Sequence, residues 1–150
     1  MKCISKKRII VSVLMVAFLL GLFVPRYEVS AASKKARYWA QLFGPDYKGD
    51  AQNFKTIKFK KNKLVIKASL KKGNNVKVYS SPDDVNLKMK KRTFKISKKC
   101  KFYAGGAEDG INRISRKEFK SYTKKYMGSG LALIIYTNKK GQIYKMVMKC

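Results

Sequence analysis

Lysine side chains supply most of the chemistry that this sequence offers. They alternate with apolar residues from Lys55 to Lys72 and again from Lys88 to Lys101. A strand with this alternation buries one face and presents ammonium groups on the other, which is typical of surfaces that attract anions. Lysine far outnumbers arginine, and this favours diffuse attraction over the bidentate recognition that arginine provides.

Two tyrosines near these basic runs could stack on bases or sugars. Solvated strand faces would give the same alternation, so the prediction concerns the surface rather than any single lysine. The candidate binding residues are Lys67, Lys71, Lys72, Lys91, Arg92, Lys95, Lys98, Lys99 and Lys101, together with Tyr79 and Tyr103.

The side chains needed for catalysis are scarce. The sequence contains no histidine, which removes the most frequent general base and metal ligand. Asp83 and Asp84 follow Pro82 in a predicted loop, where neighbouring carboxylates usually serve turn chemistry. A Ser–Lys pair stays open because both residue types abound, but no motif frames one. We therefore predict that the protein is not an enzyme and that it has no metal site and no cofactor.

The charge of the chain points to anionic partners. The sequence has 36 lysine and arginine residues against 8 aspartate and glutamate residues, a formal net charge of +28. Such a charge costs stability through self-repulsion, so the fold alone does not explain it. A lysine-rich surface that only keeps a small protein soluble is the simpler alternative. We expect attraction to anionic polymers of the cell envelope or extracellular glycans, and to nucleic acid without sequence preference.

The N-terminus has the three parts of a secretory signal peptide. Basic residues up to Arg8 precede an apolar run from Ile9 to Val24, and Val29-Ser30-Ala31 offers small residues for cleavage. We predict a signal peptide at 1–31 and a protein that is secreted or associated with the cell surface. An uncleaved anchor is the alternative, although the apolar run is shorter than the roughly 20 residues of a membrane span. Cleavage would leave no stable transmembrane span.

Two cysteines, Cys100 and Cys150, follow the predicted signal peptide. Outside the cytoplasm such a pair permits a disulfide. A bridge that closes a loop of roughly 50 residues would stabilise the fold by about 3–4 kcal/mol. We predict this bridge, with two free thiols as the alternative.

Residues 32–53 are predicted to be a lead-in segment with a short helix at 36–43, which ends before Gly44-Pro45. The segment contains Trp39, the one tryptophan of the sequence. A large aromatic side chain adds much buried area to a small core. We therefore expect Trp39 to plug one end of the domain, and an exposed contact patch is the alternative.

After the lead-in segment, the apolar period is that of strands, interrupted once by a helix. Ser115 and Glu118 form a capping box, and Phe119, Tyr122 and Tyr126 give the following helix one apolar face. The strands are predicted at 54–60, at 64–70 with a short extension at 76–79, at 93–103, at 131–136 and at 143–148.

Three strands, a helix and two strands follow one another in the order of the OB-fold. Its barrel closes when the third and fifth strands meet, and the predicted disulfide lies at these two strands. We predict a mainly β protein with an OB-like β-β-β-α-β-β barrel in residues 54–150. An α+β antiparallel sheet with one packing helix is the alternative. The second and third strands, the usual ligand face of the OB-fold, hold many of the candidate lysines.

Three segments of the chain carry a resemblance to known proteins. They are the strand at 93–97, the loop and helix start at 105–119 and the closing hairpin at 128–143. With them, residues 54–148 resemble a loose group of small, lysine-rich secreted bacterial proteins with an OB-like barrel. The resemblance implies the fold and the export, and it assigns no functional residue.

The leading functional hypothesis is an exported, non-catalytic and strongly cationic binding module that associates with anionic cell-surface polymers or other polyanions. One alternative is a cationic membrane-active effector, although the sequence lacks the long basic amphipathic helix that such proteins usually have. The other alternative is an interaction domain for an acidic protein partner, which would form one saturable complex.

Overall fold

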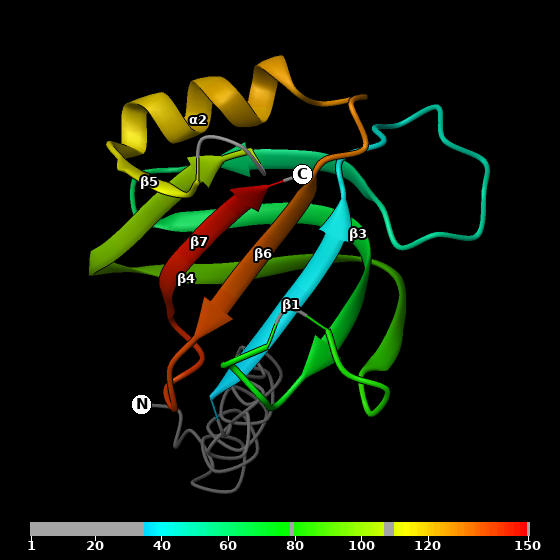
Figure 1. The fold of residues 1–150 in the computed structure, drawn as a ribbon, viewed down its shortest axis with the longest axis horizontal. Coiled ribbons are helices and arrows are strands. Elements are labelled where there is room, and N and C mark those ends of the chain that lie inside the picture. The colour runs from blue at the N-terminus through cyan, green and yellow to red at the C-terminus, as the bar shows by residue number, and fades with distance from the viewer. Residues whose placement is uncertain (1–34, 79, 107–109, 150) are drawn as a thin grey trace, which may run out of the picture. The chain divides into compact units, whose positions relative to one another are not determined.

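A computed structural model describes residues 35–78, 80–106 and 110–149 (Figure 1). The chain from Ala32 to Cys150 forms one compact unit with its own hydrophobic core. The predicted signal peptide at 1–31, Tyr79 and Cys150 lie outside the described residues.

The unit is mainly β, as the sequence predicts, and the described residues include a single helix. Its elements are β1 (Ala36–Gln41), β2 (Phe54–Phe59), β3 (Lys63–Gly73), β4 (Val85–Gly105), β5 (Asn112–Ile114), α2 (Arg116–Lys125), β6 (Ala132–Thr137) and β7 (Ile143–Lys149).

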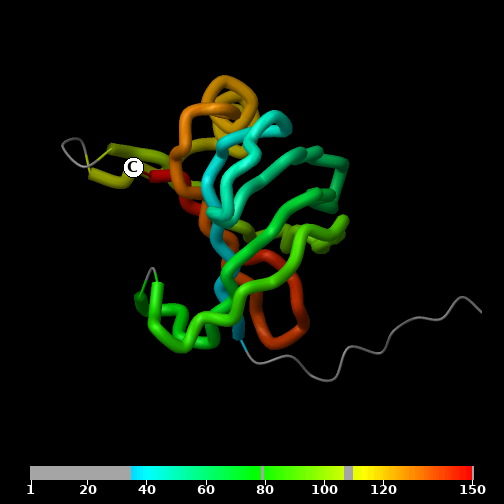
Figure 2. The backbone as a smooth tube through the Cα atoms, turned by 90° about the vertical axis from the view of Figure 1, so that its right-hand side faces the viewer, coloured from blue at the N-terminus to red at the C-terminus, as the bar shows by residue number. Residues whose placement is uncertain are grey.

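The strands form one mixed sheet in the order β2-β3-β1-β6-β7-β4-β5. An additional pairing between β3 and β4 closes five of these strands into the ring β1-β3-β4-β7-β6 (Figures 1 and 2). All pairs in the ring are antiparallel except β4 and β7, which run parallel. The strands β2 and β5 end the sheet and lie outside the ring.

Strand alternation fills the inside of the ring. On β3, Leu64, Ile66, Ala68 and Leu70 are fully buried, while the residues between them are exposed or half-buried. Burial of one such large apolar side chain stabilises a fold by about 1.5–3 kcal/mol. The period of two in the sequence therefore predicts this strand and its inner face correctly.

Strand β4 is long enough to pair with β3, β5 and β7. The sequence predicts its start at residue 93, but the strand starts at Val85. Its first half pairs with β3 as far as Lys95, and its last residues pair with β5 and β7 after a register shift between Ile96 and Lys101. The lysine-rich stretch 88–91, which precedes the strand predicted at 93–103, is therefore part of the sheet.

The helix α2 begins at the predicted capping box. The Glu118 amide donates to the Ser115 hydroxyl at 3.2 Å, and the Ser115 amide donates to the Glu118 carboxylate at 2.7 Å. Phe119 is fully buried, with its ring centre 5.2 Å from that of Phe102 and 6.3 Å from that of Phe59. In Figure 1 the helix lies across one end of the strands.

The predicted helix at 36–43 is wrong, because residues 36–41 form strand β1. This strand pairs with β6 along its whole length and with β3 through Arg37, Tyr38 and Trp39. Neighbours on both sides outweigh the weak local preference for a helix. Trp39 consequently packs on the outer side of the ring beside Ile134 and Val147, and Phe119 rather than Trp39 plugs the core.

The first strand of the ring is thus β1, in the segment predicted as a lead-in. The strand predicted at 54–60 exists as β2, but it is an edge strand outside the ring. The ring domain therefore begins at Ala36 and not at residue 54.

Residues 76–79 are predicted to extend the strand at 64–70, but they belong to a loop at 74–84 that folds back against β1. Arg37, fully buried, donates to both carboxylate oxygens of Asp84 and to the Val78 carbonyl. The Ser81 amide and the Trp39 indole also donate to Asp84, at 3.1 and 3.4 Å. The buried pair Arg37–Asp84 fixes this loop, which Figure 2 shows beside the start of β1.

Candidate functional site

Lys63 and Lys67 of β3 and Lys91 and Lys95 of β4 form a surface that we name the β3–β4 cationic face. The strand register sets Lys63 opposite Lys95 and Lys67 opposite Lys91. All four side chains are exposed, since the alternate residues of β3 fill the core.

The β3–β4 cationic face brings like charges together. Residues directly opposite in an antiparallel pair have β-carbons about 4.5–5.5 Å apart, and like charges there destabilise the sheet. None of these four lysines forms an ion pair with a carboxylate of the described residues. An anion bound over the face would relieve this repulsion, so the arrangement favours binding of negative charge.

Two other candidates, Lys71 and Lys72, are held against aromatic rings. The Lys71 ammonium lies 5.3 Å from the centre of the Trp39 ring, and the Lys72 ammonium lies 6.0 Å from that of Tyr38. Both lysines are half-buried, and such cation–π contacts stabilise a fold by about 0.5–1 kcal/mol at exposed sites. These two lysines are less available to a ligand than the four of the β3–β4 cationic face.

Arg92 serves the fold rather than the surface. Its guanidinium donates to the carbonyls of Ala68 at 2.7 Å, Lys88 at 2.9 Å and Lys90 at 3.2 Å. Burial lowers the pKa of Arg92 and raises the pKa of the neighbouring Tyr38, and each of these two groups opposes the shift of the other. Arg92 thus stabilises the irregular pairing of β3 with β4 next to Ala68.

The last candidates lie on the far part of β4. Lys98, Lys99 and Lys101 are exposed there, beyond the part that pairs with β3. Tyr103 pairs with β7, and the Lys145 ammonium lies 5.4 Å from the centre of its ring. The structure therefore separates Tyr103 from the β3–β4 cationic face, because β4 leaves β3 for β7. Tyr79 lies outside the described residues.

Cys100 is a half-buried cysteine on β4, without a disulfide partner among the described residues. Burial raises its pKa to about 12, although the Arg116 guanidinium acts in the opposite direction. The register pairs Lys149 with Gly105, five residues beyond Cys100, which is about 16 Å along a strand. A Cys100–Cys150 bridge requires α-carbons within about 7 Å, so the end of β7 would have to leave this register. The bridge stays a prediction, since Cys150 is outside the described residues.

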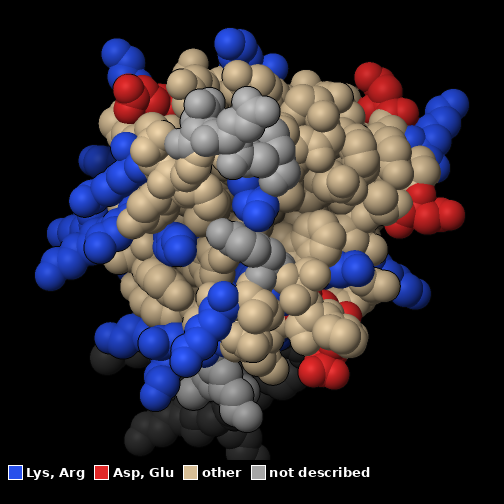
Figure 3. Space-filling model, in the orientation of Figure 1, with Lys and Arg blue, Asp and Glu red and all other residues tan. Residues whose placement is uncertain are grey.

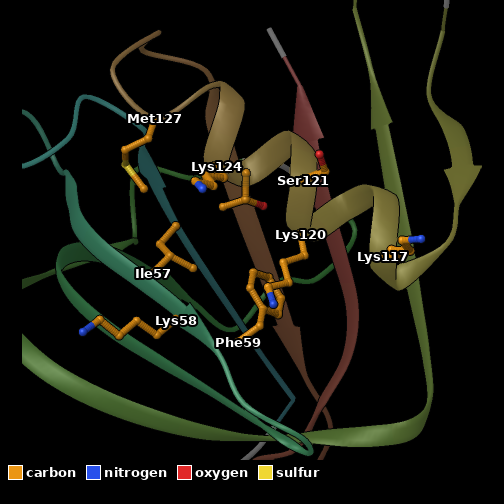
Figure 4. A pocket seen from close by; sticks show the side chains of 9 residues that line it. Ile57, Lys58, Phe59, Lys117, Lys120, Ser121, Lys124 and Met127 are labelled. Carbon is orange, nitrogen blue, oxygen red and sulfur yellow. The ribbon is translucent and has the colours of Figure 1, made fainter.

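A cavity that the sequence did not reveal lies between β2 and α2 (Figure 4). It has a volume of about 540 Å³. We name it the β2–α2 groove. Its lining residues are Ile57, Phe59, Thr123 and Met127, with Ser121 and the lysines Lys58, Lys117, Lys120 and Lys124.

No motif in the sequence indicates the β2–α2 groove, because lysines on a helix are usually a solvated face. The signal for it was the spacing of Lys117, Lys120 and Lys124, which places these residues on neighbouring turns of one helix face. Only the position of β2 beside the helix gives these lysines an apolar floor, and the sequence does not encode that position locally.

The remaining charged groups do not neutralise the basic surface. Lysine and arginine side chains dominate the left flank of the face in Figure 3, and most acidic side chains in this view lie on the other flank. Within the described ranges, no group of three or more metal-binding side chains is found, and no helix is long and apolar enough to span a membrane.

Comparisons with protein-family models, with curated proteins and with solved structures found no match to this chain.

Proposed function

We propose that this chain is an exported, non-catalytic binding module that holds anionic polymers against its β3–β4 cationic face. The observation that carries the proposal is the opposition of Lys63 to Lys95 and of Lys67 to Lys91, with no carboxylate of the described residues paired to them. Repulsion of this kind lowers stability, and a polyanion converts it into binding energy.

We further interpret the ring of five strands as an OB-like barrel. Two features support this interpretation: α2 lies between the third and fourth ring strands in chain order, and the third ring strand, β4, pairs with the fifth, β7. In that fold the second and third strands form the ligand face. In this chain those strands are β3 and β4, which carry the β3–β4 cationic face.

The chemistry of the face suits a polymer better than a small ligand. Lysine ammonium groups are compact charges without the fixed fork of arginine, and they are spread along two strands rather than gathered in a cavity. We propose anionic polymers of the cell envelope and extracellular glycans as partners, with nucleic acid bound through its phosphates alone. The location outside the cytoplasm rests on the signal-peptide pattern of residues 1–31.

The experiment is a salt titration of the unit 32–150 on three supports: an anionic polysaccharide, anionic vesicles and single-stranded DNA. Binding through released counterions weakens steeply with salt, so we expect all three affinities to fall in parallel. Retention that ignores ionic strength would refute the proposal. Leakage of the vesicles at the same protein concentration would favour a membrane-active effector instead.

Charge-matched variants locate the surface. Lys67→Gln with Lys91→Gln removes two charges from the β3–β4 cationic face, and Lys48→Gln with Lys77→Gln removes two exposed charges elsewhere. We expect the first pair to elute from the polysaccharide at clearly lower salt than the second. Equal elution would mean that net charge alone governs retention.

A further inference from the structure

Strand β2 ends the seven-stranded sheet, so one of its edges has no neighbouring strand among the described residues. The Lys60 amide donates to the Lys63 carbonyl at 2.9 Å, so Lys60 and Lys63 are a hydrogen-bonded pair at the turn between β2 and β3. Bonded and non-bonded pairs alternate along antiparallel strands. The amide and carbonyl groups of Ile57 and Phe59 therefore point away from β3 and toward the free edge.

The β2–α2 groove lies beside this free edge. The side chains of Ile57 and Phe59 line the groove, and no hydrogen-bond partner of their outward amides and carbonyls occurs in the described part of the chain. Three lysines border the groove from α2 and Lys58 borders it from β2, and none of its lining residues is acidic. In Figure 4 the Lys120 side chain extends from the helix toward Phe59.

We propose that the free edge of β2 and the β2–α2 groove bind an extended, acidic segment of a partner protein as an added strand. The main chain of the segment would bond to the amides and carbonyls of Ile57 and Phe59. Its apolar side chains would lie against Ile57, Phe59 and Met127. Its acidic side chains would meet Lys58 on one face of the added strand and the helix lysines on the other.

The charges of the edge select this occupant over a second copy of the chain. Two β2 edges in contact would place the lysines of both copies, Lys55 and Lys58 among them, close to one another. Lysines on an edge strand are a common defence against such self-association. The same lysines attract an acidic strand, and the four open main-chain groups distinguish a polypeptide from an anion that has only charge to offer.

This inference is independent of the proposed function, because it concerns a different surface. The β3–β4 cationic face lies on the pairing of β3 with β4, whereas β2 lies on the opposite edge of β3. Loss of polyanion binding and loss of strand addition can therefore be separated by mutation.

The test uses the unit 32–150 and a short, capped peptide of alternating glutamate and valine. Two further peptides carry N-methyl groups, one on all glutamate amides and the other on all valine amides. Only one of the two sets can face β2, since alternate residues of a strand point to opposite sides. We expect saturable one-to-one binding of the parent, about tenfold weaker binding of one methylated peptide and unchanged binding of the other. Equal affinities of all three peptides would overturn the proposal, because charge alone would then explain the binding.

Variants of the protein provide a second test of the proposed strand addition. Ile57→Pro removes an amide on the free edge and no bond to β3, and proline is tolerated at such edge positions. We expect this variant to lose about tenfold in affinity for the parent peptide and to keep its retention on the anionic polysaccharide, while an unchanged circular dichroism spectrum confirms that it is folded. In this peptide the valines face the groove and the glutamates face the side of β2 that carries Lys58, so Lys58→Gln should weaken peptide binding more than Lys99→Gln, an exposed lysine on β4. Unchanged peptide affinity in both Ile57→Pro and Lys58→Gln would reject the site.

Discussion

Arg37 and Lys67 lie on neighbouring strands of the same ring, but their positive charges have opposite surroundings. The Arg37 guanidinium is fully buried and bonded to both carboxylate oxygens of Asp84. The Lys67 ammonium is exposed and faces a second positive charge at Lys91.

The two positions differ in the side chain that the following segment of the chain places beside them. The loop that follows β3 brings Asp84 back over β1, so the Arg37 charge is neutralised within the fold. The next segment of the chain is β4, which returns along β3 with lysines at the facing positions. The Arg37 charge therefore serves the fold, whereas the Lys67 charge remains available to a ligand.

Breaking the buried pair should have the largest effect on the molecule. Asp84→Asn keeps the shape of the side chain but leaves the buried Arg37 charge without its counterion. Loss of one partner of such a pair costs about 3–5 kcal/mol. We expect a loss of this size in the free energy of unfolding, measured by urea denaturation.

The matched control replaces both partners. Arg37→Met with Asp84→Leu removes the charges together, and substitution of a whole buried pair by apolar residues is often neutral. The double variant should therefore be more stable than Asp84→Asn. If it were equally unstable, the contribution of the pair would come from its geometry and not from its charge.

A second change gives the exposed face the missing counterion. Lys67→Glu places a carboxylate opposite Lys91, which replaces a repulsive cross-strand pair with an attractive one. We expect the free energy of unfolding to rise by about 0.2–1 kcal/mol, while retention on the anionic polysaccharide falls. A variant that gained stability and kept its retention would place the polyanion site elsewhere.

The parts of the fold that could be predicted are those with a strong local signal. Alternation in β3 and the reciprocal cap at Ser115 and Glu118 specify their elements without help from the rest of the chain. Residues 36–41 do not, because a short segment with apolar residues at every second or third position suits both a helix and a strand. Pairing with β3 and β6 decides for the strand.

The candidate site shows the same division. Alternation along β3 and β4 predicts which lysines are exposed, but only the register reveals that Lys67 faces Lys91. Arg92 belongs to the same run of basic residues, but its guanidinium is used by main-chain carbonyls of both strands. The partner of Arg37 and the β2–α2 groove depend on distant segments, so local patterns give no signal for them.

Cys100 tests whether burial or neighbouring charge governs a group within this basic protein. Nearby cations should acidify a thiol, but burial raises the pKa of Cys100 to about 12. We expect iodoacetamide to modify Cys100 at pH 8 at least a hundredfold more slowly in the folded Cys150→Ser variant than in urea, because the thiolate is the reactive form. Equal rates would mean that the thiol is accessible and that the surrounding charge prevails.

The smallest expected effect concerns Glu118, an exposed carboxylate whose charge is used locally. Hydrogen bonds from the hydroxyl and amide of Ser115 lower the pKa of Glu118 below its ordinary value of 4.5. A group whose pKa is lower in the folded state stabilises the fold above its unfolded pKa, and this stabilisation is lost as the pH falls through the folded pKa. Glu118→Gln keeps a side chain that can complete the capping box but does not titrate. We expect the variant to be slightly less stable than the wild type at pH 7, and the difference to shrink once the pH falls below 4.5 and to vanish on further acidification, measured by urea denaturation across this range. A difference that persisted in acid would show that the cap depends on the shape of the glutamate rather than on its charge.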